Sequence, residues 1–380
     1  MRTTAATYDR LAELPVEIQS YDLERLEQPV SSEFTRVTTV IRLRGGGEEG
    51  VGEDVTYSAE DQDAQQKGPR LPLSAAPRTL DDFSHFLDEL DLFPSGPALP
   101  AFLDYRRWAY ESAALDLALR QARVSLGAAL ERDPRPVRFV ASTRQTALLR
   151  PWLDLYPRLR FKLDPTSDWD ERLVEEVAAL DATDIVDFKG AYHGTPVDQP
   201  PDAALYERVA AAFPEALIED PALTPDTDPV LEPHRDRISW DAPIHSVDDV
   251  ERLPFPPRVL NVKPSRFGTL RRLLDFYDYC AEREIRLYGG GQFELGPGRA
   301  QIQYLAALFH ADAPNDVAPG GYNAAPAPGL PESPLEPAWP ERGFGLPQNG
   351  RPGKARTSSR SSVSAAEEPR RIRVENSESS

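Results

Sequence analysis

The chain has 380 residues, 40% of them hydrophobic, and a formal net charge of −19 at pH 7. This length predicts two domains, or one (β/α) barrel of about 250 residues with an added module. The acidic balance argues against nucleic acid or an anionic membrane as a partner. No apolar run reaches the ~20 residues of a membrane span, and the first residues lack the apolar core of a secretory signal, so we expect a cytoplasmic protein.

Lysine and cysteine are both scarce in this chain. Only five of the 43 basic residues are lysines: Lys67, Lys162, Lys189, Lys263 and Lys354. Arginine stays protonated, whereas a desolvated lysine can act as a base, so a retained lysine is a candidate for chemistry. The single cysteine, Cys280, cannot form an internal disulfide, and the helical pattern around it favours a buried structural thiol over a nucleophile.

The first third of the chain predicts an α+β module that follows an N-terminal arm, residues 1–15. Residues 16–57 alternate apolar and polar positions around the turn at Gly45–Gly47, which is typical of antiparallel strands. Residues 58–77 are polar with scattered proline, and we expect a loop. Residues 79–90, with Thr79 as a helix cap, and residues 106–122 have apolar positions at helical spacing.

From about residue 136, short apolar strands alternate with helices. Eight predicted strands, spaced by about 20–30 residues, fit a parallel barrel better than an open sheet. They are residues 137–142, 160–164, 184–190, 216–221, 237–243, 259–266, 285–291 and 315–319. The fold class predicted is therefore α/β, a TIM-type (β/α) barrel behind an α+β domain.

Proline dominates after Asn323, and we expect residues 324–347 to pack back on the body. Residues 348–380 are rich in Gly, Ser, Arg and Glu with few apolar residues, which predicts a disordered tail.

Four successive predicted strands each end in an ionisable residue: Asp187, Glu219, Asp241 and Lys263. The carboxyl ends of parallel barrel strands meet on one face, so these side chains should enter one cleft. Three carboxylates in such a cleft repel one another unless a cation neutralises them. Carboxylate oxygens, without cysteine or a histidine pair, favour Mg²⁺ and allow Mn²⁺.

At these residues the sequence resembles the enolase superfamily, in particular the branch with muconate lactonizing enzyme and o-succinylbenzoate synthase. The motifs are GVGE at 50–53, WAYESAALDLAL, VDF, IEDP, WDAPIHS, NVKPSRFGTL and YGGGQFELGPGRAQIQYLAALF. The resemblance implies an α+β capping domain (16–125) over a barrel (126–323). It further implies Asp187, Glu219 and Asp241 as Mg²⁺ ligands, Lys263 as the catalytic base, and an enediolate intermediate.

One motif departs from that branch, which usually carries K-x-K at the end of the second strand. Here the residues are Lys162, Leu163 and Asp164, and Lys189 stands on the third strand where the branch often has asparagine. Lys162 would raise the positive potential near the metal. Asp164 and Lys189 suggest a charge exchange, with either a structural ion pair between them or a catalytic Lys189.

Several further residues have two readings each. Arg266, Gly290 and Glu294 are candidates for substrate contact, although each also fits an ordinary loop or ion-pair role. His193 and His245 lie just beyond strand ends, where either could serve as a second acid, but surface histidines are more common.

The sequence therefore predicts a metal-dependent lyase or isomerase that removes the proton next to the carboxylate of a small substrate. A catalytically silent metal- and metabolite-binding protein, an o-succinylbenzoate synthase-like or cycloisomerase activity, and a metal-free anion-binding barrel are the alternatives. The sequence decides neither the substrate nor whether the chain forms a homo-oligomer.

Overall fold

The computed structural model describes residues 6–30, 34–75, 79–192, 197–336 and 339–345. The predicted disordered tail, residues 348–380, and His193 lie outside these ranges. None of the helices within them is long and apolar enough to cross a membrane.

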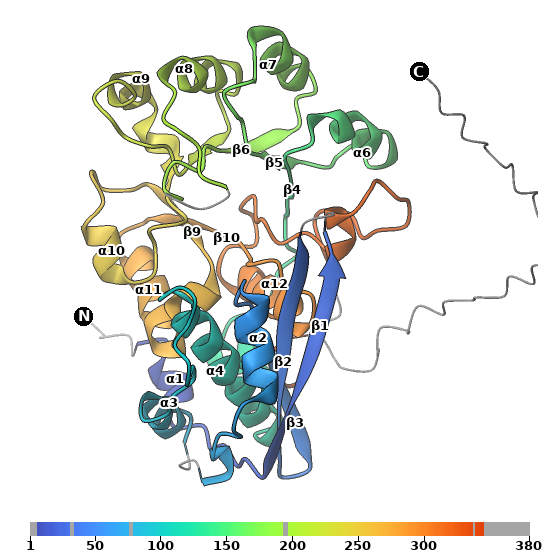
Figure 1. Cartoon of the computed structure of the whole chain (residues 1–380), viewed down its shortest axis with the longest axis vertical. Helices are drawn as coiled ribbons and strands as arrows, with labels where there is room; N and C mark the ends of the chain where they lie inside the picture. Colours follow the sequence, from blue (N-terminus) through green and yellow to red (C-terminus); the bar gives the residue numbers. More distant parts are fainter. Residues whose placement is uncertain (1–5, 31–33, 76–78, 193–196, 337–338, 346–380) are drawn as a thin grey trace, which may run out of the picture. The chain divides into compact units, whose positions relative to one another are not determined.

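The N-terminal domain is a three-stranded antiparallel sheet covered by one long helix (Figure 1). Its strands are β1 (Ser20–Pro29), β2 (Thr35–Gly45) and β3 (Glu48–Asp54), and the covering helix is α4 (Phe102–Gln121). The other helices are α1 (Asp9–Ala12), α2 (Ala59–Lys67), α3 (Leu80–Asp88) and α5 (Leu126–Leu130). The expected cap of α3 is confirmed, because the Thr79 side chain accepts a hydrogen bond from the Asp82 amide at 3.1 Å.

Two glycines let α4 lie directly on β3. A Cβ atom at Gly50 would come within 2.3 Å of the Leu117 nitrogen, and one at Gly52 within 2.0 Å of the Ala109 oxygen. Both are backbone atoms of a buried helix and cannot move aside cheaply. The GVG part of the GVGE motif therefore serves helix packing.

The loop expected at residues 58–77 is wrong, because α2 occupies residues 59–67. The Ser58 side chain caps this helix by accepting from the Asp61 amide at 3.0 Å. The fully buried Gln62 donates from Nε2 to the Asp54 and Thr56 carbonyls, each at 3.0 Å. The helix is anchored by hydrogen bonds instead of apolar packing, so its sequence carries no hydrophobic period.

The second domain alternates parallel strands with helices, as predicted. The strands are β4 (Ala141–Thr143), β5 (Phe161–Leu163), β6 (Thr183–Asp187), β7 (Leu217–Glu219), β8 (Ile238–Ser239), β9 (Val259–Val262) and β10 (Arg286–Gly289). The helices are α6 (Leu149–Leu155), α7 (Glu171–Ala178), α8 (Ala203–Ala212), α9 (Asp228–Leu231), α10 (Val247–Glu251), α11 (Leu270–Glu282) and α12 (Pro297–Phe309).

These strands follow the order of a barrel without forming one continuous ladder. Strands β4 to β8 make one parallel sheet, and β9 and β10 make a second. The Asn261 amide donates to the Trp240 carbonyl at 3.1 Å between the two sheets. Single bridges from Gly290 to Asp316 and from Asn315 to Phe139 continue the order on the other side, where the eighth strand was expected.

Residues near both ends of the described chain pack on this body. Tyr8 and Leu11, from the segment expected to be an arm, are buried in the main core. In the proline-rich segment, Leu335 bridges Val137, and the buried Phe344 donates its amide to Asp116 at 2.7 Å.

Glu53, the last residue of the GVGE motif, ties the N-terminal domain to the barrel. Its buried carboxylate accepts hydrogen bonds of 2.7–3.0 Å from the amides of Leu295, Gly296 and Gly298. These amides lie just before and within the first turn of α12, where N–H groups lack intrahelical partners. Burial and the neighbouring Glu294 raise the pKa of Glu53, whereas these hydrogen bonds lower it.

Candidate metal and catalytic site

The predicted site residues meet at the carboxyl ends of the barrel strands. Asp187 and Glu219 are the last residues of β6 and β7 and face each other in register. Asp241 follows β8 by two residues, and Lys263 directly follows β9. All four side chains are buried. The structure thus places the residues together as the strand spacing predicts.

A group of carboxylates that could hold a metal ion consists of Asp187, Glu219 and Asp220. One oxygen from each lies within 4.8 Å of the others, and all three residues are buried. Buried carboxylate oxygens are the donors that hard divalent cations such as Mg²⁺ prefer, so the residues fit the metal that the sequence predicts. The group contains Asp220, which was not predicted, in place of Asp241.

Asp220 also positions the segment that carries Asp241. Its two carboxylate oxygens accept from the amides of Asp241 and Ala242, each at 2.8 Å. Burial, with Asp241 and Asp187 nearby, raises the pKa of Asp220 to about 7. Its backbone has a φ of +45°, a conformation that aspartate tolerates better than most residues. Two adjacent acids in IEDP were the available signal, but strand alternation points only one of them inward.

Asp241 forms ion pairs with two cations. It accepts from Lys263 Nζ at 2.8 Å and from Arg266 Nη1 at 2.7 Å. Tyr192, which was not predicted, donates its hydroxyl to Asp241 Oδ2 at 2.7 Å. Burial would raise the pKa of Asp241, but Arg266 and Lys263 hold it well below its ordinary value. Of the two roles considered for Arg266, the structure shows an ion pair.

Lys162 lies between the first two carboxylates. Its Nζ donates to Glu219 Oε1 and lies 3.0 Å from Asp187 Oδ2 and 3.7 Å from Asp316 Oδ2. Burial alone would lower the pKa of Lys162, but Asp187 and Glu219 raise it well above its ordinary value. This lysine is therefore a fixed positive charge beside the two carboxylates.

Lys189 forms the suggested ion pair with Asp164, but its closer partner is Asp187. The ammonium of Lys189 donates to Asp187 Oδ2 and lies 3.9 Å from Asp164 Oδ1. Asp164 also accepts from Arg144 Nε at 2.8 Å. Lys189 has a φ of +54°, in the left-handed region that asparagine adopts more readily than lysine. The charge exchange suggested by the sequence thus brings a second ammonium onto Asp187.

Of the remaining candidates, Gly290 makes room for Lys263, whereas Glu294 and His245 make contacts within the fold. A Cβ atom at Gly290 would lie 2.9 Å from Lys263 Cε, so this glycine leaves room for the lysine chain. Glu294 accepts from the Gln292 amide at 2.7 Å and lies 3.2 Å from Arg299 Nη2. His245 contacts the Ala242 carbonyl at 3.1 Å, and burial lowers its pKa.

Tyr288 was also missed, although it reaches the site through the barrel. Its hydroxyl donates to Glu219 Oε2 at 2.5 Å and lies 2.8 Å from Ser239 Oγ. The side chain is completely buried. In the sequence, Tyr288 lies within an apolar strand, and only the GGG turn that follows it could have indicated a site residue here.

Comparison with known sequences identifies relatives over parts of the chain. Residues 9–129 match the N-terminal domain, and residues 133–324 the C-terminal domain, of a family described as domain of unknown function DUF8230. The o-succinylbenzoate synthase of Geobacillus stearothermophilus is 31% identical over 173 residues, 43% of each chain. That of Bacillus subtilis strain 168 is 38% identical over 82 residues, 21% of this chain and 22% of the relative. The chain therefore spans less than half the length of these curated relatives.

Solved structures share the fold more widely. An enolase superfamily member from Listeria innocua Clip11262 is 22% identical with a TM-score of 0.62, covering 80% of this chain and 86% of that one. Muconate lactonizing enzyme from Pseudomonas putida is 18% identical with a TM-score of 0.59, covering 79% and 88%. Dipeptide epimerase from Methylococcus capsulatus, complexed with Mg ion, is 18% identical with a TM-score of 0.61, covering 81% and 92%.

These matches confirm the resemblance and the fold class predicted from the sequence. The superfamily fold extends over four fifths of the chain, and the matched regions include both domains. The chain belongs to the DUF8230 family and shares its fold with the enolase superfamily member and the muconate lactonizing enzyme described above.

Proposed function

We propose that this chain removes the proton next to the carboxylate of a small substrate, with Lys263 as the base. One observation carries the proposal: Lys263 and a buried carboxylate group that fits a divalent cation lie together at the carboxyl end of the barrel. Solved structures with this fold have their catalytic sites at that end of the strands as a rule. The product would arise by elimination, epimerisation or another isomerisation.

The residues around Lys263 support a role in moving a proton. Asp241 holds Nζ at 2.8 Å, and Gly290 leaves space beside the lysine chain. Both hold the amine in one place, as a general base requires. Arg266 shares Asp241, so this carboxylate stays paired when the lysine changes its protonation state.

Asp187 and Glu219, with Asp220 or Asp241 as a third ligand, would hold Mg²⁺, or Mn²⁺ in its place. When bound, this ion supplies positive charge to the oxygens of a substrate carboxylate, which makes the neighbouring proton more acidic. Lys162 contacts both ligands and adds a permanent positive charge beside them. Asp164 is bound to Arg144, so it does not take the place of a second catalytic lysine in this arrangement.

A catalytically silent metabolite-binding protein is the second candidate, and a specific observation favours it. Three buried carboxylates, Asp187, Glu219 and Asp241, are each paired with one or two of four cations: Lys162, Lys189, Lys263 and Arg266. These carboxylates therefore have partners of opposite charge without a metal ion. An o-succinylbenzoate synthase-like or cycloisomerase reaction is a narrower form of the first proposal and follows from the relatives' names.

Exchange of the α-proton with deuterated water separates the two candidates. Purified protein is incubated with a panel of small carboxylates, with Mg²⁺ or with EDTA, and exchange is followed by NMR. We expect exchange on at least one substrate, and only with the metal. Mg²⁺ binding is measured in parallel by calorimetry for the wild type and Glu219→Gln. Absence of exchange on every substrate, with intact Mg²⁺ binding, would favour the silent protein, and unchanged binding in Glu219→Gln would remove that ligand.

A further inference from the structure

A cavity of about 710 Å³ opens at the amino ends of the barrel strands, opposite the site above. Arg138 and Arg160 precede β4 and β5 in this cavity, Asp184 lies near the start of β6, and Arg286 begins β10. Asp184 and Asp187 belong to the same strand, three residues apart, so the two ends are separated by about 10 Å. A volume of this size is ordinary for a small-molecule site.

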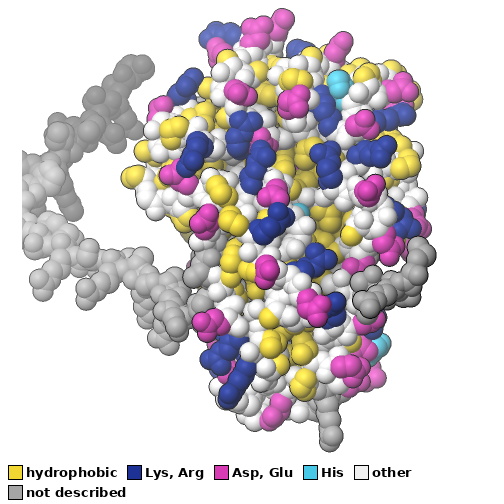
Figure 2. All heavy atoms as spheres, turned by 180° about the vertical axis from the view of Figure 1, so that it is seen from behind, with side chains coloured by type: hydrophobic (Ala, Val, Ile, Leu, Met, Phe, Trp, Pro, Cys, Tyr) yellow, Lys and Arg dark blue, Asp and Glu magenta, His cyan; other side chains and the backbone are white. Residues whose placement is uncertain are grey.

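Arginines dominate the polar lining of this cavity and of a smaller one beside it, of about 460 Å³. The arginines are Arg132, Arg135, Arg138, Arg158, Arg160 and Arg286. Three acids, Asp184, Glu215 and Asp312, line the same two cavities. In a chain with a net charge of −19, an excess of cations in one hollow is unusual. Figure 2 shows basic side chains close together on one face of the molecule, with hydrophobic side chains exposed between them.

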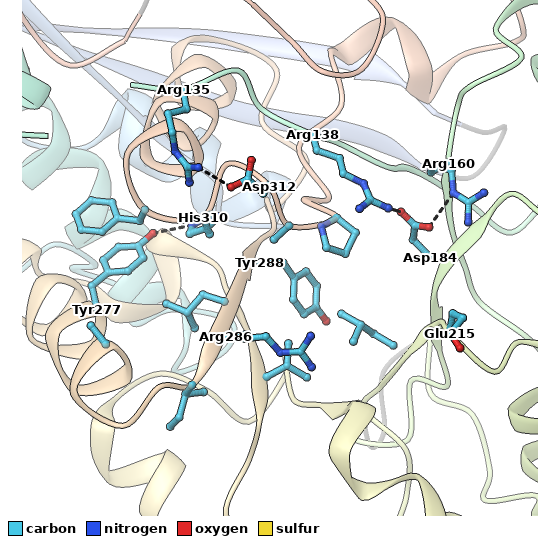
Figure 3. Close-up of a pocket in the computed structure, with 18 of the residues that line it drawn as sticks. Arg135, Arg138, Arg160, Asp184, Glu215, Tyr277, Arg286, Tyr288, His310 and Asp312 are labelled. Carbon is cyan, nitrogen blue, oxygen red and sulfur yellow. Dashed lines mark hydrogen bonds and ion pairs between the residues drawn. The ribbon is translucent and has the colours of Figure 1, made fainter. Parts of the chain in front are cut away.

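The arginines are only partly neutralised. A single carboxylate, Asp184, serves both Arg138 and Arg160, as the dashed lines in Figure 3 show. Arg135 lies 2.5 Å from Asp312, but both side chains are more than half exposed. Arg286 forms no ion pair with any described residue, and Arg132 lies over the Phe309 ring at 4.5 Å. Guanidinium groups in this state can still bind an incoming carboxylate through two hydrogen bonds.

The wall of the cavity between these arginines is apolar and aromatic. Tyr277 and Phe309 stack with ring centroids 4.0 Å apart, and the Tyr277 hydroxyl is held by His310 at 3.1 Å. Leu287 and the buried Tyr288 continue this wall. A ligand that suits both surfaces carries an anionic group for the arginines and a flat apolar body for the wall.

We propose that this hollow, the arginine cavity, is a second binding site for a small aromatic carboxylate. The cavity is separate from the carboxylate group at the other end, and it does not depend on a metal. Tyr288 connects the two, because it lines the cavity and donates its hydroxyl to Glu219.

Calorimetry with 2-naphthoate, in EDTA, tests the proposal on the full chain. Saturable one-to-one binding is expected for the wild type. Arg286→Gln and Arg132→Gln should each weaken it roughly tenfold or more, because each removes a charged hydrogen-bond donor. Arg283→Gln is the matched control: this arginine lies three residues from Arg286, pairs with Glu282 and does not line the cavity, so binding should change less than about twofold.

Three comparisons make the result decisive. Lys263→Ala should bind 2-naphthoate as the wild type does, and loss of binding there with retention in Arg286→Gln would overturn the location. The neutral 2-naphthamide and inorganic phosphate should both bind at least about tenfold more weakly than 2-naphthoate. Equal binding of either one would overturn the ligand class, and absence of saturable 2-naphthoate binding would overturn the site itself.

Discussion

Charged side chains lie at both ends of the barrel strands, but their burial and their pairing differ between the two ends. At the carboxyl ends, Asp187, Glu219 and Asp241 are fully buried and each contacts at least one ammonium or guanidinium group. At the amino ends, Asp184 is nearly buried, while the Arg138 and Arg160 side chains that share it are 46% and 32% exposed. The charges at the carboxyl ends are therefore buried and paired, whereas the arginines at the amino ends are partly exposed and outnumber the acids there.

This difference has a physical meaning. Buried charges are costly to desolvate and are retained only where partners hold them in defined geometry, which is what proton transfer requires. Half-exposed arginines have a small desolvation cost in the folded chain, and little free energy is lost when a ligand replaces the water around them. The carboxyl end is therefore suited to chemistry, and the amino end to reversible binding.

The largest expected effect is on proton exchange at the carboxyl end. Lys263→Ala should lower the rate of α-proton exchange about 10²- to 10⁴-fold, the usual contribution of a general base. Arg266 still pairs with Asp241 in this variant, so the fold should persist. The rate is measured by NMR on the best substrate of the carboxylate panel. Lys67→Ala, at an exposed lysine of α2, is the control and should exchange normally. An unchanged rate in Lys263→Ala would remove this lysine from the mechanism.

The second largest effect is expected on the free energy of unfolding of Asp241→Asn. Asp241→Asn leaves Lys263 and Arg266, with side chains only 8% and 4% exposed, without their shared carboxylate. Breaking a buried ion pair in this way costs about 3–5 kcal/mol of the free energy of unfolding. Urea denaturation in EDTA measures the loss against the wild type. A loss below about 1 kcal/mol would show that the two cations find other partners or water.

The sequence predicted the strands and the convergence of Asp187, Glu219, Asp241 and Lys263, because both depend on a repeating βα pattern that local residues encode. It could not predict which cations neutralise these acids. Lys162 reaches Asp187 from the neighbouring strand β5, and Lys189 from two residues beyond Asp187 itself; where such long side chains end depends on the packing around them. Helix α2 was missed because Gln62 anchors it through hydrogen bonds, which leave no periodic pattern. The position of Asp220 depends on its positive φ, and no residue type in the sequence indicates that conformation.

A smaller effect is expected from removing the second ammonium on Asp187. Lys189→Asn keeps a residue suited to the local φ of +54° and leaves Asp187 Oδ2 with one ammonium partner, Lys162, instead of two, so Mg²⁺ affinity should rise about tenfold or more. Calorimetric titration with Mg²⁺ and with Mn²⁺ measures this change. Lys67→Asn serves as the control. Unchanged affinity would mean that Lys189 moves aside without cost, which would weaken the case for a silent protein.

The smallest expected effect completes the comparison at the amino end. Asp184→Asn removes the one carboxylate shared by Arg138 and Arg160, yet both guanidinium groups can turn to water. The free energy of unfolding should fall by about 1 kcal/mol or less. The same urea measurement used for Asp241→Asn gives a direct contrast between the two ends. Because the variant leaves the arginine cavity more positive, 2-naphthoate should bind it at least as tightly as the wild type. A loss of stability comparable to that of Asp241→Asn would show that the ion pairs of these arginines stabilise the barrel. The distinction between a carboxyl end suited to chemistry and an amino end suited to reversible binding would then be wrong.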